Sequence, residues 1–119
     1  MLTLFAALLL SLQPQSNPIG EAAAGLRAEI EDDNGPDAMM TAIASAGCTV
    51  TIGGVEGRRW TLDMTRTQAV ALEDTFVYVA AGEAKLAIVG EASRPDQAAK
   101  LRALADALTA LASRCTPPR

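Results

Sequence analysis

The chain has 119 residues, half of them hydrophobic but only 3% aromatic, which suits one domain with a core of small aliphatic side chains. Its net charge of −4 argues against nucleic-acid binding, because an acidic protein repels phosphate backbones. The sequence contains no histidine and therefore lacks the commonest general acid–base group and metal ligand.

The N-terminus carries an apolar run over residues 2–12. This run is too short to span a bilayer, which takes about 20 residues, and it is typical of a secretory signal peptide. We therefore predict a signal peptide over residues 1–16, one α+β domain over residues 17–116, a disordered tail over residues 117–119, and a periplasmic or secreted protein. No basic residue precedes the run, so a buried N-terminal helix or a short membrane anchor remains an alternative.

The mature chain is expected to begin with a helix. Asn17 is a favourable N-cap and Pro18 fits the first helical turn. The spacing of apolar residues predicts that this helix continues through Ile30. An acidic segment over residues 31–37 follows, and residues 38–46 predict a short second helix that ends at Gly47.

From Cys48 the apolar period changes to two, which is typical of strands. Residues 48–52 and 59–65 predict a hairpin joined by the glycine-rich segment 53–57. Residues 67–74 fit a strand or a helical turn, and we assign them as a loop. Residues 75–80 and 84–89 predict a second hairpin.

The last element is a helix over residues 95–115, for which Ser93 and Asp96 suggest a capping box. Its apolar face is formed by Leu101, Leu104, Leu108, Leu111 and Cys115. The predicted fold is an α+β two-layer sandwich, in which a four-stranded antiparallel meander carries the N-terminal helices and the C-terminal helix on one face. We expect the last helix to cross the face formed by Val50, Ile52, Trp60 and Leu62.

The two cysteines, Cys48 and Cys115, predict a single disulfide, because paired cysteines in a small exported domain are usually oxidised. The C-terminal helix would then be fixed at its end to the start of the first predicted strand.

No catalytic motif is present, and we expect neither enzymatic activity nor a cofactor. A serine nucleophile would need Lys85 or Lys100 as its base, and no motif links either lysine to a serine. A small hydrolase that uses two carboxylates, Asp63 with Glu73 or Asp74, remains an alternative.

Two segments resemble ligand sites without matching them, and we expect no metal site. The acidic segment 31–37 has Ile30 and Thr41 where a calcium-binding EF-hand needs acidic ligands. The segment 53–59 lacks the Lys-Ser/Thr ending of a phosphate-binding loop, and we interpret it as a hairpin turn.

The remaining hypothesis is a binding or accessory module that recognises a protein or envelope component. We expect it to bind no nucleic acid and to have no stable membrane span after the signal peptide is cleaved. The candidate surface is the sheet face away from the helices together with nearby arginines, namely Thr49, Thr51, Arg58, Arg59, Thr61, Asp63 and Arg66. Phe76 or Tyr78 is a candidate anchor on that face. The alternative is a secreted inhibitor or immunity-type protein that presents residues 53–57 or 67–74 as a protruding loop.

Overall fold

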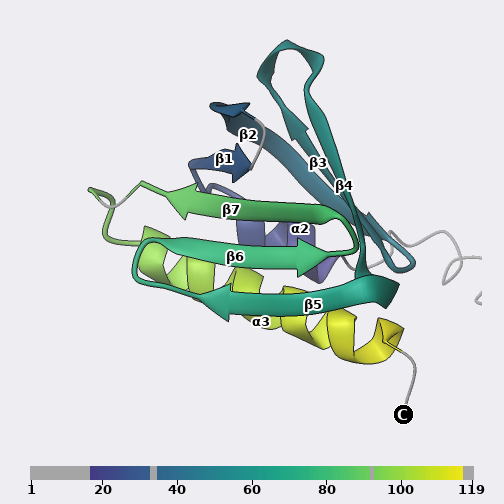
Figure 1. Cartoon of the computed structure of the whole chain (residues 1–119). Helices are drawn as coiled ribbons and strands as arrows, with labels where there is room; N and C mark the ends of the chain where they lie inside the picture. Colours follow the sequence, from purple (N-terminus) through teal and green to yellow (C-terminus); the bar gives the residue numbers. More distant parts are fainter. Residues whose placement is uncertain (1–16, 33–34, 92, 117–119) are drawn as a thin grey trace, which may run out of the picture.

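The computed structural model describes residues 17–32, 35–91 and 93–116, which form one seven-stranded antiparallel sheet with two α-helices (Figure 1). The helices are α2 (Pro18–Ala23) and α3 (Gln97–Cys115). The strands are β1 (Ala28–Asp32), β2 (Gly35–Ala46), β3 (Thr49–Gly54), β4 (Arg59–Asp63), β5 (Thr67–Leu72), β6 (Phe76–Ala81) and β7 (Ala84–Gly90). Their order across the sheet is β4-β3-β2-β1-β7-β6-β5.

The α+β class is confirmed, but the predicted four-stranded meander is wrong. The structure adds β1, β2 and β5, and β1 pairs with both β2 and β7. The chain therefore forms two meanders, β1 to β4 and β5 to β7, which join in the middle of one sheet. The three-residue helix η2 (Met64–Arg66) connects β4 to β5, the two outermost strands.

The first helix is shorter than predicted because the chain leaves the helical path at Gly25. This residue has φ of +76°, a left-handed conformation that glycine adopts without a Cβ clash. Beyond it, Ala28 and Ile30 are buried while Glu29 and Glu31 are exposed. This two-residue period belongs to strand β1, and the helical spacing of the apolar residues was coincidental.

The predicted second helix over residues 38–46 is instead the long strand β2. Alanine and methionine favour helices, but strand preference depends strongly on the neighbours in the sheet. Met39 lies opposite Glu29 of β1, and Ile43 lies opposite Ile52 of β3. Hydrogen bonding on both edges therefore outweighs the weak helical preference of this segment.

Residues 67–72, assigned as a loop, form the edge strand β5, in which Val70 lies opposite Val79 of β6. The other strand predictions are confirmed. Val50 pairs with Leu62 in the β3–β4 hairpin, and Val77 pairs with Ile88 in the β6–β7 hairpin.

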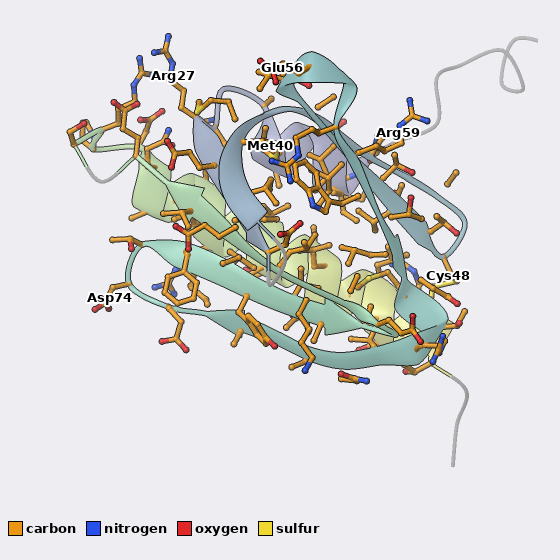
Figure 2. All side chains as sticks on the ribbon, turned by 45° about the horizontal axis from the view of Figure 1, so that its top comes forward. Arg27, Met40, Cys48, Glu56, Arg59 and Asp74 are labelled. Atoms are coloured by element: carbon orange, nitrogen blue, oxygen red, sulfur yellow. A yellow bond between two sulfur atoms is a disulfide. The ribbon has the colours of Figure 1, made fainter. Side chains whose placement is uncertain are left out.

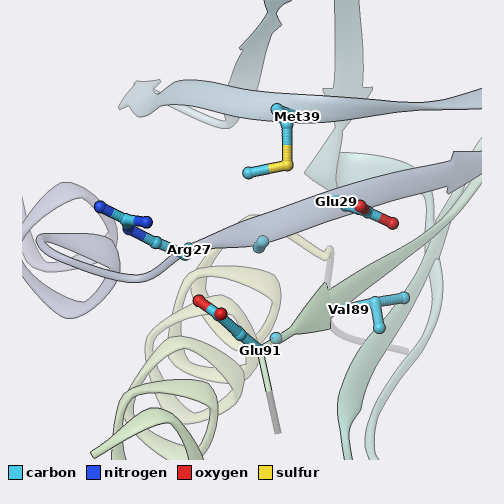
Figure 3. Close-up of a pocket in the computed structure, with 7 residues that line it drawn as sticks. Arg27, Glu29, Met39, Val89 and Glu91 are labelled. Carbon is cyan, nitrogen blue, oxygen red and sulfur yellow. The ribbon is translucent and has the colours of Figure 1, made fainter. Parts of the chain in front are cut away.

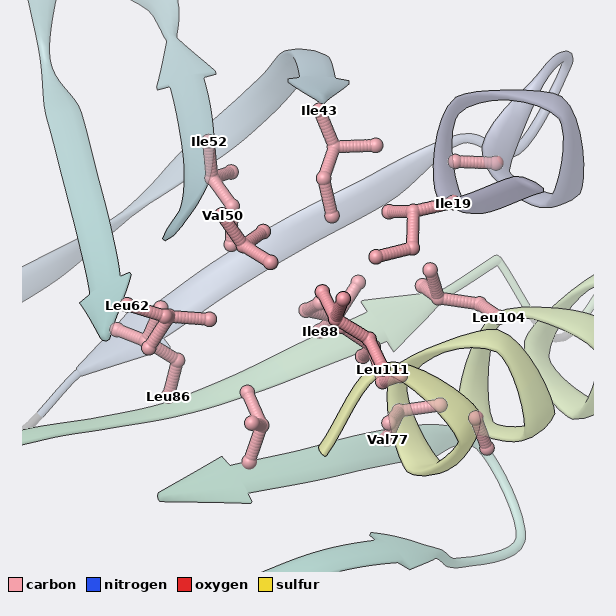
Figure 4. Close-up of a cluster of buried hydrophobic side chains, with 14 of the residues drawn as sticks. Ile19, Ile43, Val50, Ile52, Leu62, Val77, Leu86, Ile88, Leu104 and Leu111 are labelled. Carbon is pink, nitrogen blue, oxygen red and sulfur yellow. The ribbon is translucent and has the colours of Figure 1, made fainter. Parts of the chain in front are cut away.

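One hydrophobic core lies on the side of the sheet that we call the inner face (Figure 4). The predicted apolar face of α3 is buried there, since its leucines are at most 6% exposed, namely Leu101, Leu104, Leu108 and Leu111. The helix does not cross the β3–β4 hairpin as expected, but lies along β5, β6 and β7. The sheet curls, so that β4 approaches β6 and β7 across the core and Leu62 is fully buried.

Helix α2 packs against α3 and β2, and its Ile19 joins the same core. Both helices therefore cover the inner face, and no described helix covers the opposite, outer face (Figure 1). No helix within the described ranges is long and apolar enough to cross a membrane. The predicted signal peptide and the tail over residues 117–119 lie outside the described residues.

The disulfide between Cys48 and Cys115 is confirmed, with a Cα–Cα distance of 5.8 Å. Cys48 occupies the β2–β3 turn beside Gly47, and Cys115 is the last residue of α3. The bond therefore fastens the end of the helix to the first meander, although the helix itself lies on the second one.

Of the two N-terminal helix caps predicted from the sequence, one is confirmed. Asn17 caps α2 as predicted, since its side-chain oxygen accepts the N–H of Gly20 at 3.1 Å. The predicted capping box of α3 is absent, because the helix begins at Gln97 and the Ser93 hydroxyl donates to Glu91 instead.

Candidate functional site

The outer face carries two aromatic side chains side by side with small residues. Phe76 lies opposite Val89, and Tyr78 lies opposite Ala87 on one side and Ala71 on the other. Phe76, Tyr78 and Val89 are half-buried rather than enclosed. We call these five residues, which come from β5, β6 and β7, the aromatic strip. It is an apolar surface centred on β6, which is hydrogen-bonded to β5 on one side and to β7 on the other.

A shallow groove of about 370 Å³ adjoins the aromatic strip at Val89 (Figure 3). Its walls come from β1, β2 and β7, where Glu29 lies between Met39 and Val89 in neighbouring strands. Met39 is 41% exposed, which is unusual for a large apolar side chain. Arg27 and Glu91 lie at its rim, so the groove combines the apolar side chains of Met39 and Val89 with charged ones, including Glu29 between them.

Five of the seven residues predicted as a partner surface lie on the outer face of β3 and β4. Thr49 lies opposite Asp63 and Thr51 opposite Thr61, while Arg59 lies opposite Gly53. The other two are elsewhere. Arg58 folds over the ring of Trp60, and Arg66 lies at η2 beside Gly82.

Asp63 ends β4 with a local hydrogen-bond motif. The Thr65 hydroxyl and the Thr65 backbone N–H both donate to its Oδ1, at 2.5 and 3.1 Å. These bonds stabilise the carboxylate and, with a smaller contribution from Arg66, hold the pKa of Asp63 below its ordinary value of 3.8.

A lowered carboxyl pKa makes a stabilising contribution that is present above the unfolded-state pKa and is lost as pH falls through the folded-state pKa. We expect an NMR titration of Asp63 to give a midpoint below 3.8. Replacing Thr65 with valine removes the hydroxyl donor and should raise this midpoint, whereas replacing it with serine should not. An unchanged midpoint in the valine variant would contradict the assigned cause.

The β3–β4 hairpin projects from the rest of the sheet and ends in the short helix η1 (Val55–Gly57) (Figures 1 and 2). Val55 at this tip is 41% exposed, and Glu56 has φ of +61°. Left-handed backbone in a residue other than glycine is strained, and it persists where the surrounding structure holds it in place.

The base of the tip is braced from the inner side. The indole N–H of Trp60 donates to Asp32 Oδ2 at 2.7 Å, and the Arg58 guanidinium lies 5.1 Å from the Trp60 ring centroid. The same carboxylate lies 4.0 Å from Arg58. Gly54 accommodates this packing, because a Cβ there would lie 2.8 Å from the Trp60 ring.

Replacing Asp32 with alanine should lower the free energy of unfolding by about 1–3 kcal/mol, because the Trp60 indole N–H loses its acceptor. Trp60 is the single tryptophan of the chain, so its fluorescence reports on this site directly. We expect the emission to shift to the red in Asp32→Ala and to remain near wild type in Asp32→Asn, which keeps an acceptor oxygen. An unchanged spectrum in the alanine variant would contradict the bracing role of Asp32.

The residues considered for hydrolysis are not brought together. Asp63 precedes β5 and Glu73 follows it, so the full length of that strand, about 20 Å, separates the two carboxylates. The amine of Lys100 donates to the carbonyl of Ala24 at 2.5 Å. Within the described part of the chain, no group of three potential metal ligands is found.

Comparison of the chain with protein-family models, curated protein sequences and solved structures gives no match. The functional argument therefore rests on the geometry of the surfaces described above.

Sequence reasoning missed the groove, because Arg27, Glu29 and Met39 fell in segments that were predicted to be helices. The signal was present in the alternation of Ala28 and Ile30 with Glu29 and Glu31, which gives a strand with an acidic outer face.

Proposed function

We propose that this protein is an exported, non-catalytic binding module that engages a partner protein through the outer face of its sheet. The observation that carries the proposal is the aromatic strip, which lies on a sheet face that no described helix covers. In a small domain, both helices are used on the other face to enclose the core, which leaves this face available for contacts.

The aromatic strip has the composition of a binding hot spot. Tyrosine is enriched at such positions because it supplies a large rigid contact area and a polar group. Tyr78 has alanines on both cross-strand sides, so a partner can approach its ring closely. The backbone below is held by strands on each side and loses little entropy on binding.

The groove beside the strip indicates the chemistry of the partner. Its exposed Met39 and half-buried Val89 accept an apolar side chain. Glu29 in this groove, with Glu31 farther along β1, favours a basic neighbour on the partner, whereas Glu91 is already paired with Arg94 at 3.3 Å. We therefore expect a partner surface that pairs an apolar side chain with lysine or arginine, and an association rate that falls with salt.

Export is supported by two independent features. The apolar run at residues 2–12 is typical of a signal peptide, and disulfides such as Cys48–Cys115 persist mainly in oxidising compartments.

A second candidate function, a secreted inhibitor or immunity-type protein, is favoured by the hairpin tip. The tip projects from the sheet at Glu56 (Figure 2). It carries the exposed Val55 and is braced by Trp60 and Asp32. A preorganised loop of this kind fits an enzyme cleft at low entropic cost.

Site-specific photocrosslinking in the native host separates these functions. A benzoylphenylalanine is placed at Tyr78 on the outer face, at Val55 on the tip, or at Ala110 on the exposed side of α3 as a control. The proposal predicts one specific adduct from position 78. An adduct from position 55 alone supports the inhibitor function, and equal yields from all three positions contradict both.

A further inference from the structure

Helix α3 begins without a side-chain cap. Asp96, the residue before the helix, makes no hydrogen bond from its side chain to the first turn. A capping side chain normally accepts the N–H of the second or third helical residue, which here are Ala98 and Ala99. Neither N–H group has an acceptor within the described ranges. These donors and the helix dipole favour an oxygen acceptor at this end of the helix, a need that water alone also meets.

A further unpaired donor beside them is shielded from solvent. Gln97, the first residue of α3, is 2% exposed. Its Oε1 accepts the backbone N–H of Arg27 at 3.2 Å, and this bond fixes which end of the amide is the nitrogen. The Nε2 atom has no hydrogen-bond partner within the described part of the chain. Buried donors are rarely left unpaired, so this nitrogen indicates a polar group that the single chain does not supply.

Gln97 lines a cavity of about 150 Å³ between the start of α3 and the turn from β5 to β6 (Figure 1). A cavity of this volume is large enough for a molecule the size of benzene. Arg94 also lines it through a guanidinium whose Nε lies 3.3 Å from Glu91, so the two terminal nitrogens remain as donors. The cavity therefore collects donors from the helix backbone, an amide and a guanidinium, a set that binds a carboxylate.

One charge at the cavity has the opposite sign. Asp74, in the turn from β5 to β6, is exposed and makes no ion pair or side-chain hydrogen bond within the described ranges. Its carboxylate repels a simple anion and attracts a cation. A ligand that carries a carboxylate and an ammonium group on neighbouring atoms satisfies both requirements, and an α-amino acid has this arrangement.

A wider groove of about 310 Å³ continues from the cavity along α3. The cavity and the groove share Asp74 and Leu101 in their walls. The groove also contains Leu72, which is 39% exposed, and the charged residues Glu73 and Arg102. Because the methylene stem of an arginine packs on apolar groups, these walls accept an aliphatic side chain next to the polar cavity.

We propose that the cavity and the groove together bind a free α-amino acid with an aliphatic side chain. Its carboxylate accepts hydrogen bonds from Gln97 Nε2 and from the first-turn N–H groups of α3. Its ammonium group donates to Asp74, and its side chain lies in the groove against Leu72. Since α3 lies on the inner side of the sheet, this site is separate from the outer face and adds small-molecule binding to the proposed partner binding.

NMR titration of the mature, oxidised, ¹⁵N-labelled protein with leucine tests the proposal. We expect saturable shifts of the Gln97 side-chain amide and of the Ala98 and Ala99 N–H signals, with a Kd below about 1 mM. Asp74→Asn should weaken leucine binding by about fivefold, because an exposed ion pair has a small effect, and should not weaken binding of 4-methylpentanoate, which lacks the ammonium group. Asp106→Asn makes the same charge change at an exposed position of α3 and should bind leucine like the wild type.

No shift of the Gln97 amide signal at about 10 mM leucine overturns the proposal. It is also overturned if leucinamide, which lacks the carboxylate, binds as well as leucine, or if acetate alone produces the same shifts. Tighter binding of the dipeptide Ala-Leu would instead identify the C-terminus of a peptide as the occupant and overturn the assignment to a free amino acid. These outcomes do not depend on photocrosslinking at Tyr78, which lies on the outer face.

Discussion

Replacing Cys48 and Cys115 with alanine is expected to lower the free energy of unfolding by about 4 kcal/mol. The bond joins residues that are 67 positions apart, and its loss gives the unfolded chain a long loop of additional freedom. Since small domains have total stabilities of about 5–15 kcal/mol, this single bond supplies a large share of the total.

Urea unfolding of the oxidised wild type and of the double alanine variant measures this effect. Reductant should destabilise the wild type by the same amount and should leave the alanine variant unchanged. A loss below about 1 kcal/mol would mean that helix α3 holds its position without the covalent bond, and it would contradict the stabilising role assigned to the disulfide.

Replacing Leu108 with alanine is expected to lower the free energy of unfolding by about 2–5 kcal/mol, because it leaves a cavity where α3 packs on the sheet. Leu108 is fully buried in the same cluster as Val77 and Ile88. The neighbouring residue Thr109 is exposed, and its replacement by alanine should change the stability by less than about 0.5 kcal/mol.

Thermal unfolding of the two variants provides the comparison. The Leu108→Ala variant should also lose stability when the disulfide is reduced, because packing and cross-linking act on different states of the chain. Equal stability in the leucine and threonine variants would contradict the placement of this face of α3 against the inner side of the sheet.

The parts of the fold that could be predicted from the sequence depend on local pattern. The leucines of α3 repeat with the helical period, and the β3–β4 and β6–β7 hairpins combine alternating residues with glycine-containing turns. The disulfide followed from the number of cysteines and from the expected compartment. None of these inferences required knowledge of which strands are neighbours in the sheet.

The missing strands depend on long-range pairing. Strand β1 lies between β2 and β7, and β7 is more than 50 residues away along the chain. Strand β2 is rich in alanine and methionine, so its local preference is helical and only its two neighbours make it a strand. Strand β5 has only Thr67 and Val70 as strong β-formers and lies at an edge of the sheet, so its sequence alone gives little strand signal.

The candidate surface was predicted in part. Thr49, Thr51, Thr61, Asp63 and Arg59 share the outer face as expected from their alternation. Arg58 does not share that face, because its guanidinium lies over the Trp60 ring on the inner side of the hairpin. The groove around Glu29 and Met39 required the correct assignment of β1 and β2.

The central claim is that the outer face of the sheet binds a partner, and the affinity of the crosslinked partner for defined variants tests it most directly. Tyr78→Ala should weaken binding by about 30-fold, the effect of losing one hot-spot side chain, while Thr109→Ala on α3 should bind like the wild type. Calorimetric titration measures both affinities, with folding of each variant checked by its unfolding curve. A folded Tyr78→Ala variant that binds with wild-type affinity would contradict the claim.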